Sequence, residues 1–88
     1  MNLAIAKDHP AYQGHFPGHP VLPGVVLLAE AMAALGKEGW NVEGAKFLAP
    51  VEPGMTLTLA HETLASGAVR FEIRSAHGIV ATGNLAPA

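Results

Sequence analysis

The sequence predicts an α+β domain in which one long buried helix lies beside an antiparallel sheet of about five strands. Residues 25–35 combine strong helix formers with an almost continuous apolar character. After Trp40 the hydrophobic pattern changes to the alternation of strands, and short turns separate the later segments. We expect residues 1–88 to form a single domain, because so short a chain has no room for a second one.

The first two elements are a short strand and the helix. Residues 2–6, NLAIA, form a candidate strand. Residues 25–35, VVLLAEAMAAL, carry Glu30 as their only charge, and a helix that is apolar nearly all round is expected to be buried. Either Gly36 or Gly39 is suited to end this helix.

The later elements have the character of strands. In one segment Val69, Phe71 and Ile73 alternate with charged residues, which is typical of a strand with one buried and one solvated face. The short connections between segments favour antiparallel neighbours. The four segments are residues 45–49, 55–64, 68–76 and 78–86.

The composition argues against several classes of function. A net charge of −2 and a pI near 6.2 argue against nucleic acid as a partner. Cysteine is absent, so we expect no disulfide bonds and no thiol chemistry. No apolar run approaches the roughly 20 residues that cross a bilayer, so we expect no membrane association and a cytoplasmic location. Hydrophobic residues make up 50% of the chain and charged residues only 14%, which favours a homodimer or larger homo-oligomer.

Residues 14–24, GHFPGHPVLPG, are the segment most suited to chemistry. Their prolines restrict the backbone, and their glycines permit close approach. Such a segment can hold His15 in a set position, where its imidazole can act as a general base at neutral pH. Gly24 opens the helix, where free amide groups stabilise a developing oxyanion. The alternative is a structural loop with incidental histidines, and the prolines near His15 and His19 argue against a helical metal site.

Residues 14–28, GHFPGHPVLPGVVLL, resemble the signature of the β-hydroxyacyl-acyl-carrier-protein dehydratases, which have the hot-dog fold. The likeness is greater to the short dehydratase-like members linked to polyketide or aryl-polyene clusters. Residues 45–59, AKFLAPVEPGMTLTL, also resemble the strand, turn and strand that follow the helix in that family. The resemblance implies a long helix wrapped by an antiparallel sheet, in agreement with the order of elements given above.

The resemblance also implies a role for each residue at a matching position. His15 corresponds to the catalytic histidine, and Gly24 to the glycine whose amide binds the thioester carbonyl. Val21 falls where a backbone carbonyl orients the imidazole, and Phe16 would line the acyl tunnel together with the helix. The family works as a dimer on substrates carried by acyl carrier protein, and it needs no cofactor because the thioester supplies the acidity.

The chain departs from the family at the catalytic carboxylate. An Asp or Glu is expected fourteen residues after the histidine, and Ala29 stands there, followed by Glu30. One residue along a helix is a rotation of about 100°, so Glu30 would point away from the family's acid position unless the helix is shifted. Three alternatives stay open: Glu30 substitutes through such a shift, the site has lost its acid, or Ala29 is a substitution in a competent enzyme. A surface-facing or interface-paired Glu30 is the simpler interpretation of that residue.

The leading hypothesis is a 3-hydroxyacyl-thioester dehydratase of fatty-acid or polyketide-type biosynthesis. In this hypothesis His15 removes the α-proton, the amide of Gly24 holds the thioester oxygen, and a carboxylate such as Glu30 helps the hydroxyl leave as water. One alternative is a hot-dog thioesterase. A second is a non-catalytic acyl-binding subunit, which Ala29 favours.

Overall fold

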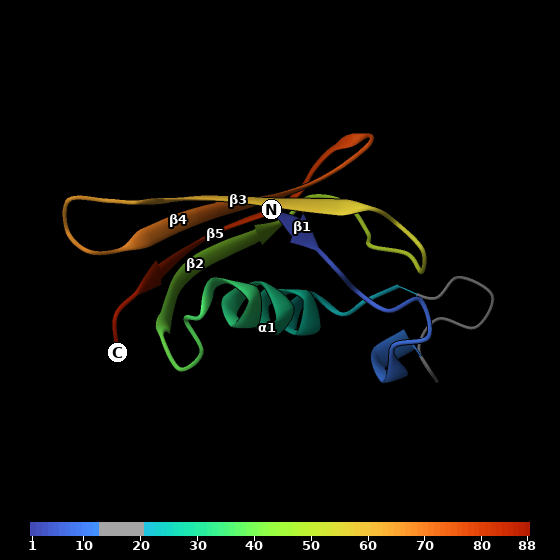
Figure 1. Ribbon diagram of the computed structural model, residues 1–88, viewed down its shortest axis with the longest axis horizontal. Helices are drawn as coiled ribbons and strands as arrows, with labels where there is room; N and C mark the ends of the chain where they lie inside the picture. Colours follow the sequence, from blue (N-terminus) through green and yellow to red (C-terminus); the bar gives the residue numbers. More distant parts are fainter. Residues whose placement is uncertain (13–20) are drawn as a thin grey trace.

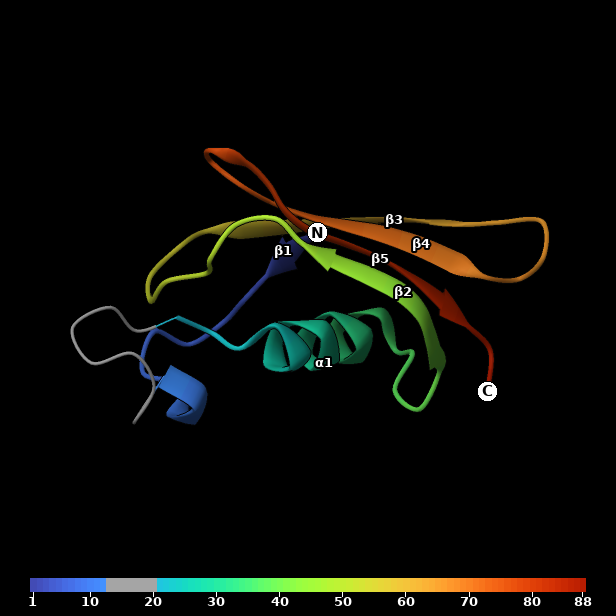
Figure 2. The same cartoon turned by 180° about the vertical axis from the view of Figure 1, so that it is seen from behind.

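The computed structural model describes residues 1–12 and 21–88 of the chain. A sheet lies over one helix and covers a single face of it, as Figures 1 and 2 show from opposite sides. Within the described residues, no helix has the length and apolar character required to cross a membrane. The elements in chain order are β1 (Asn2–Leu3), the 3-10 helix η1 (Pro10–Tyr12), α1 (Gly24–Leu35), β2 (Asn41–Phe47), β3 (Leu57–Thr63), β4 (Val69–Ser75) and β5 (Gly78–Ala86).

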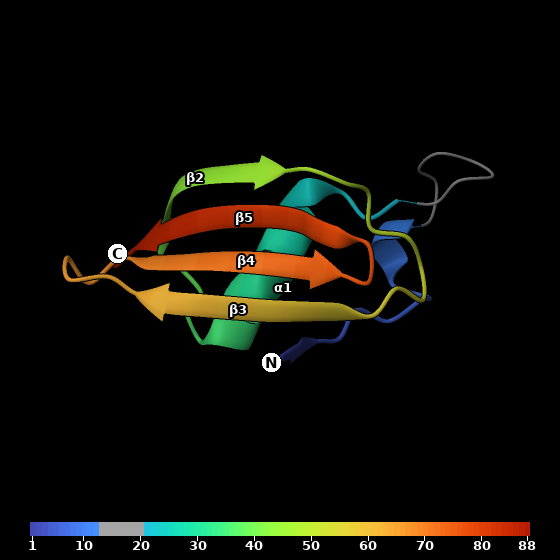
Figure 3. The same ribbon diagram turned by 90° about the horizontal axis from the view of Figure 1, so that it is seen from above.

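The sheet has five strands in the order β1-β3-β4-β5-β2, and every neighbouring pair is antiparallel. Tight turns join β3 to β4 and β4 to β5. Gly67 lies in the first of them and Gly78 begins β5, and both have positive φ. Strand β2 is added next to β5, so it forms the edge opposite β1. Figure 3 shows α1 running obliquely across the sheet. The predicted fold class, an α+β arrangement with about five antiparallel strands, is confirmed.

The core lies between α1 and the face of the sheet that covers it. Val69, Phe71 and Ile73 are buried in β4, as their alternation predicts, and the charged residues between them lie on the other face. From the helix, Leu27 and Ala31 complete this core at 2% and 0% exposure. Burial of each valine, leucine, isoleucine or phenylalanine side chain among them stabilises the fold by about 1.5–3 kcal/mol.

The predicted helix over residues 25–35 is confirmed, and it ends at Gly36 rather than Gly39. Gly36 adopts φ +68°, and its N–H donates to the carbonyl of Ala33 at 3.1 Å. The prediction that the helix is buried nearly all round is wrong. Val25 is 73% exposed and Ala29 is also exposed, because the sheet covers only one side of α1.

Two predicted strand boundaries are wrong, and tertiary pairing explains both. The strand predicted over residues 2–6 is only Asn2–Leu3, since the carbonyl of Ala6 accepts the N–H of His9 and turns the chain. Strand β2 begins at Asn41, before the predicted range 45–49. Its polar first half pairs with the end of β5, and such pairing overrides weak strand propensity. The other three strands agree with the prediction within two residues at each end.

Candidate active site

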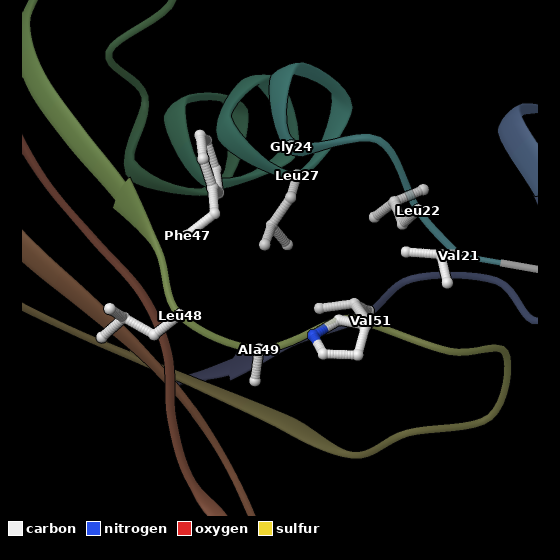
Figure 4. A pocket seen from close by; sticks show the side chains of 9 residues that line it. Val21, Leu22, Gly24, Leu27, Phe47, Leu48, Ala49 and Val51 are labelled. Carbon is white, nitrogen blue, oxygen red and sulfur yellow. The ribbon is translucent and has the colours of Figure 1, made fainter.

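A cleft of about 380 Å³ opens where α1 begins. Figure 4 shows it between the first turn of the helix and the chain that continues from β2. Its side chains are apolar, so it suits a hydrocarbon chain and not a charged ligand. The residues that line it are Val21, Leu22, Gly24, Leu27, Phe47, Leu48, Ala49, Pro50 and Val51.

Gly24 lies on one wall of this cleft, and two features distinguish its position. The carbonyl of Pro23 accepts the N–H groups of Val26 and Leu27 at 3.0 and 3.1 Å, so the N–H of Gly24 precedes the first hydrogen bonds of the helix. A Cβ on Gly24 would lie 3.0 Å from ring atoms of Phe47. The bare backbone therefore leaves room for the aromatic ring, and its amide belongs to the positive end of the helix dipole.

A β-bulge in the sheet determines where the opposite wall of the cleft lies. The register of β4 and β5 shifts between Ile73 and Arg74, which leaves Val80 as an extra residue in β5. The carbonyl of Val80 accepts the N–H groups of both Leu48 and Ala49, at 2.8 and 3.3 Å. These bonds hold the chain that follows β2 against β5, and the N–H of Leu22 donates to the carbonyl of Val51 at 2.9 Å across the cleft.

The structure brings together some of the predicted site residues. Val21 and Gly24 both line the cleft. His15 and Phe16 lie outside the described residues, so their roles stay predictions, as does the orientation of the imidazole by the carbonyl of Val21. The sequence favours a core or interface position for Phe47, and this residue lines the cleft while remaining 49% exposed.

The sequence did not predict that Leu48 and Val51 would form the far wall. Their apolar character was visible in the segment FLAPV, but the pairing with Val80 and Leu22 that places them depends on the fold.

Glu30 is not among the residues that line the cleft. Its Oε1 lies 3.2 Å from Nε2 of His9, a residue in the turn that precedes η1. Helix α1 is continuous from Gly24 to Leu35 and begins in register with the predicted motif, so Ala29 and Glu30 remain about 100° apart around its axis. Ala29 is exposed on the helix. A catalytic role for Glu30 stays a prediction.

One helix against a five-stranded antiparallel sheet, with an apolar cleft at the start of the helix, is the arrangement of a hot-dog fold. A solved structure supports this class: a chain of the dehydratase heterocomplex ApeI:P from Xenorhabdus doucetiae superposes with a TM-score of 0.80 at 26% identity. The match covers 97% of this chain and 81% of that one. The family model described as ApeI dehydratase matches residues 1–84, and the chain belongs to this ApeI-like family.

Curated relatives agree with this assignment. The 3-hydroxyacyl-acyl-carrier-protein dehydratase FabZ of Thermus thermophilus is 49% identical, over 69% of this chain and 53% of its own length. The FabZ of a Wolbachia strain from Drosophila simulans is 43% identical, over 62% of this chain and 48% of its own length. The chain thus spans about half the length of these relatives. The predicted resemblance to hot-dog dehydratases is confirmed.

Proposed function

We propose that this chain is a dehydratase of 3-hydroxyacyl thioesters carried by acyl carrier protein, in fatty-acid or polyketide-type biosynthesis. The observation that carries the proposal is the apolar cleft beside Gly24 at the start of α1. An acyl chain fits its apolar walls, and a thioester carbonyl fits the end of a helix where amide groups are free. The relatives named 3-hydroxyacyl-acyl-carrier-protein dehydratase support the same substrate class.

The reaction divides between two groups of the motif. His15 takes the proton from the α-carbon, and the N–H of Gly24 stabilises the negative charge that develops on the thioester oxygen. The electron pair of the broken C–H bond forms the double bond as the C–O bond to the β-hydroxyl breaks, and the hydroxyl leaves as water with the proton that His15 has taken up. The thioester makes the α-proton acidic, so the step requires no cofactor. The carbonyl of Val21 and the ring of Phe16 keep their proposed roles in orienting His15 and in lining the tunnel.

We also propose a homodimer in the cytoplasm, built from one hot-dog domain over residues 1–88. Large apolar side chains remain exposed around β2 and the start of α1, namely Val25, Val42, Phe47 and Leu48. Strand β2 forms a sheet edge with β5 on one side, and a second copy of this chain fits such an apolar edge. Light scattering of the purified protein should give twice the mass of the chain, and the mass of a single chain would contradict the homodimer.

A second candidate is a non-catalytic subunit that joins a different hot-dog chain. The exposed Ala29 at the position where the family has its acid favours this candidate. The structural neighbour from Xenorhabdus doucetiae is itself named a heterocomplex. In this case the catalytic residues would belong to the partner chain.

The test is an assay of the purified protein with 3-hydroxyacyl and enoyl thioesters of acyl carrier protein. Interconversion of the two, lost in His15→Ala and retained in His61→Ala, supports the dehydratase. His61 is a suitable control because it is exposed on β3, outside the cleft. Release of free thiol instead would indicate a thioesterase. Acyl binding without turnover would overturn the proposal in favour of the non-catalytic subunit.

A further inference from the structure

We infer that His9 and Glu30 form a positioning pair that fastens the segment before His15 to helix α1, so that Glu30 acts through His9 and not on the substrate. The consequence for turnover rests on the proposed function. The pair itself rests on the geometry of residues 6–12 and of the helix.

The first observation is the distance along the chain that the pair joins. Nε2 of His9 and Oε1 of Glu30 are 3.2 Å apart, although 21 residues separate them. The exposed fractions of the two side chains are 24% and 36%. Within residues 1–12 and 21–88, the Glu62–Arg70 ion pair is 61% exposed at both side chains, where water screens the interaction. The His9–Glu30 pair is better shielded, and it holds two distant segments together.

The second observation fixes the state of the imidazole. The backbone N–H of Ala11 donates to Nδ1 of His9 at 3.0 Å, so Nδ1 is the acceptor nitrogen of a neutral ring. The ring hydrogen is then on Nε2, which donates it to the carboxylate of Glu30. Both ring nitrogens of His9 take part in hydrogen bonds, and the ring therefore has one orientation and one tautomer.

The third observation is that His9 organises the turn around it. Its N–H donates to the carbonyl of Ala6, and its carbonyl accepts the N–H of Tyr12, both at 3.0 Å. Its ring meets that of Tyr12 edge to face at 6.5 Å, and Tyr12 is only 8% exposed. A 3-10 helix of three residues has little stability of its own, so this turn depends on side-chain contacts.

These contacts explain why the pair matters for the proposed site. His15 follows Tyr12 by three residues, a length of chain that spans at most about 11 Å. The turn at Tyr12 is therefore the described part of the chain that leads directly to His15. On the other side of that segment, the hydrogen bond from Leu22 to Val51 ties the chain to the cleft wall. Glu30 thus gives the upstream side an anchor on α1, the same helix that begins with Gly24.

The experiment compares substitutions that keep or remove the hydrogen bond. Glu30→Gln keeps an acceptor oxygen without the charge, whereas Glu30→Ala and His9→Ala remove the bond. We expect kcat to fall about tenfold in either alanine variant with little change in KM, and Glu30→Gln to retain kcat within about threefold. The double alanine variant should be no worse than either single one. Glu38→Ala, an exposed glutamate beyond the helix, is the matched control.

A spectroscopic measurement tests the pair independently of activity. Nitrogen-15 NMR of labelled protein should show His9 as the Nε2–H tautomer, and Glu30→Ala should shift the Nε2 resonance of His9, which loses its acceptor, while leaving His61 unchanged. An unchanged His9 spectrum in Glu30→Ala would overturn the inference. Glu30→Gln as inactive as Glu30→Ala would also overturn it, since that result assigns the carboxylate a proton-transfer role. A wild-type protein without dehydratase activity would refute the proposed function, and the NMR result would still decide the pair.

Discussion

Gly24→Ala provides the most direct test of the cleft. The added methyl group would lie 3.0 Å from Cε2 and Cζ of Phe47 and 3.1 Å from Cδ2. Carbon atoms in favourable contact are about 3.5–4.0 Å apart, so the ring must move by roughly 0.5–1 Å. Phe47 is 49% exposed, and this freedom lets the ring move at little cost.

The effect on stability should therefore be small and the effect on turnover large. Alanine gains up to about 1 kcal/mol over glycine in a helix, which offsets the cost of moving the ring. The free energy of unfolding should change by less than about 1 kcal/mol. Loss of one oxyanion donor costs about 100- to 1,000-fold in rate, and a methyl group that obstructs the donor should cost about 10- to 100-fold in kcat/KM.

The assay measures enoyl formation and denaturant unfolding on the same preparations. Gly44→Ala is the control, because its Cβ would meet nothing within 4 Å and Gly44 lies outside the cleft. The double variant Gly24→Ala/Phe47→Ala separates the two effects of the methyl group. Recovery of activity in the double variant would assign the loss to the displaced ring. A folded Gly24→Ala protein with wild-type kcat/KM would refute the role of the helix start in binding the thioester.

Two further predictions concern the core and the turn before His15. Gly83→Ala should lower the free energy of unfolding by about 1–3 kcal/mol in denaturant titrations, because its Cβ would lie 2.5 Å from the buried ring of Phe71. A stability equal to that of Gly44→Ala would contradict this packing. Burial raises the pKa of the Tyr12 phenol above its usual value of 10.0, so the stability that neutral Tyr12 contributes is complete below pH 10 and is lost as the pH rises further. Tyr12 is the only tyrosine, so tyrosinate absorbance should show a midpoint above 10 in the folded protein and near 10 in urea, and Tyr12→Phe should remove the extra loss of stability at high pH.

Local patterns were sufficient to predict most of the elements. The apolar run before Gly36 specified the helix, and the alternation around Phe71 specified a strand with one buried face. These features depend on side chains that are neighbours in sequence, whose periodicity fixes which face can be buried. The motif at residues 14–28 likewise identified the family that the comparisons confirm.

The candidate site was only partly predictable, because local patterns do not show which distant segments of the chain meet. Gly24 and Val21 belong to the motif, and both line the cleft. Phe47 is the last residue of β2, far from Gly24 in the sequence, and its place beside Gly24 follows from the pairing of β2 with β5. Glu30 is not among the residues that line the cleft, and its contact with His9 was not predicted.

The sequence alone therefore determined the types of the elements, the family and the glycine that opens the helix. The tertiary structure decided where β2 begins, which side of α1 is covered, what forms the far wall of the cleft and which residue holds Glu30. The physical reason is the range of the interactions involved. Periodicity acts over a few residues, whereas the register of a strand or a contact across 21 residues exists only after the chain has reversed direction and the core has packed.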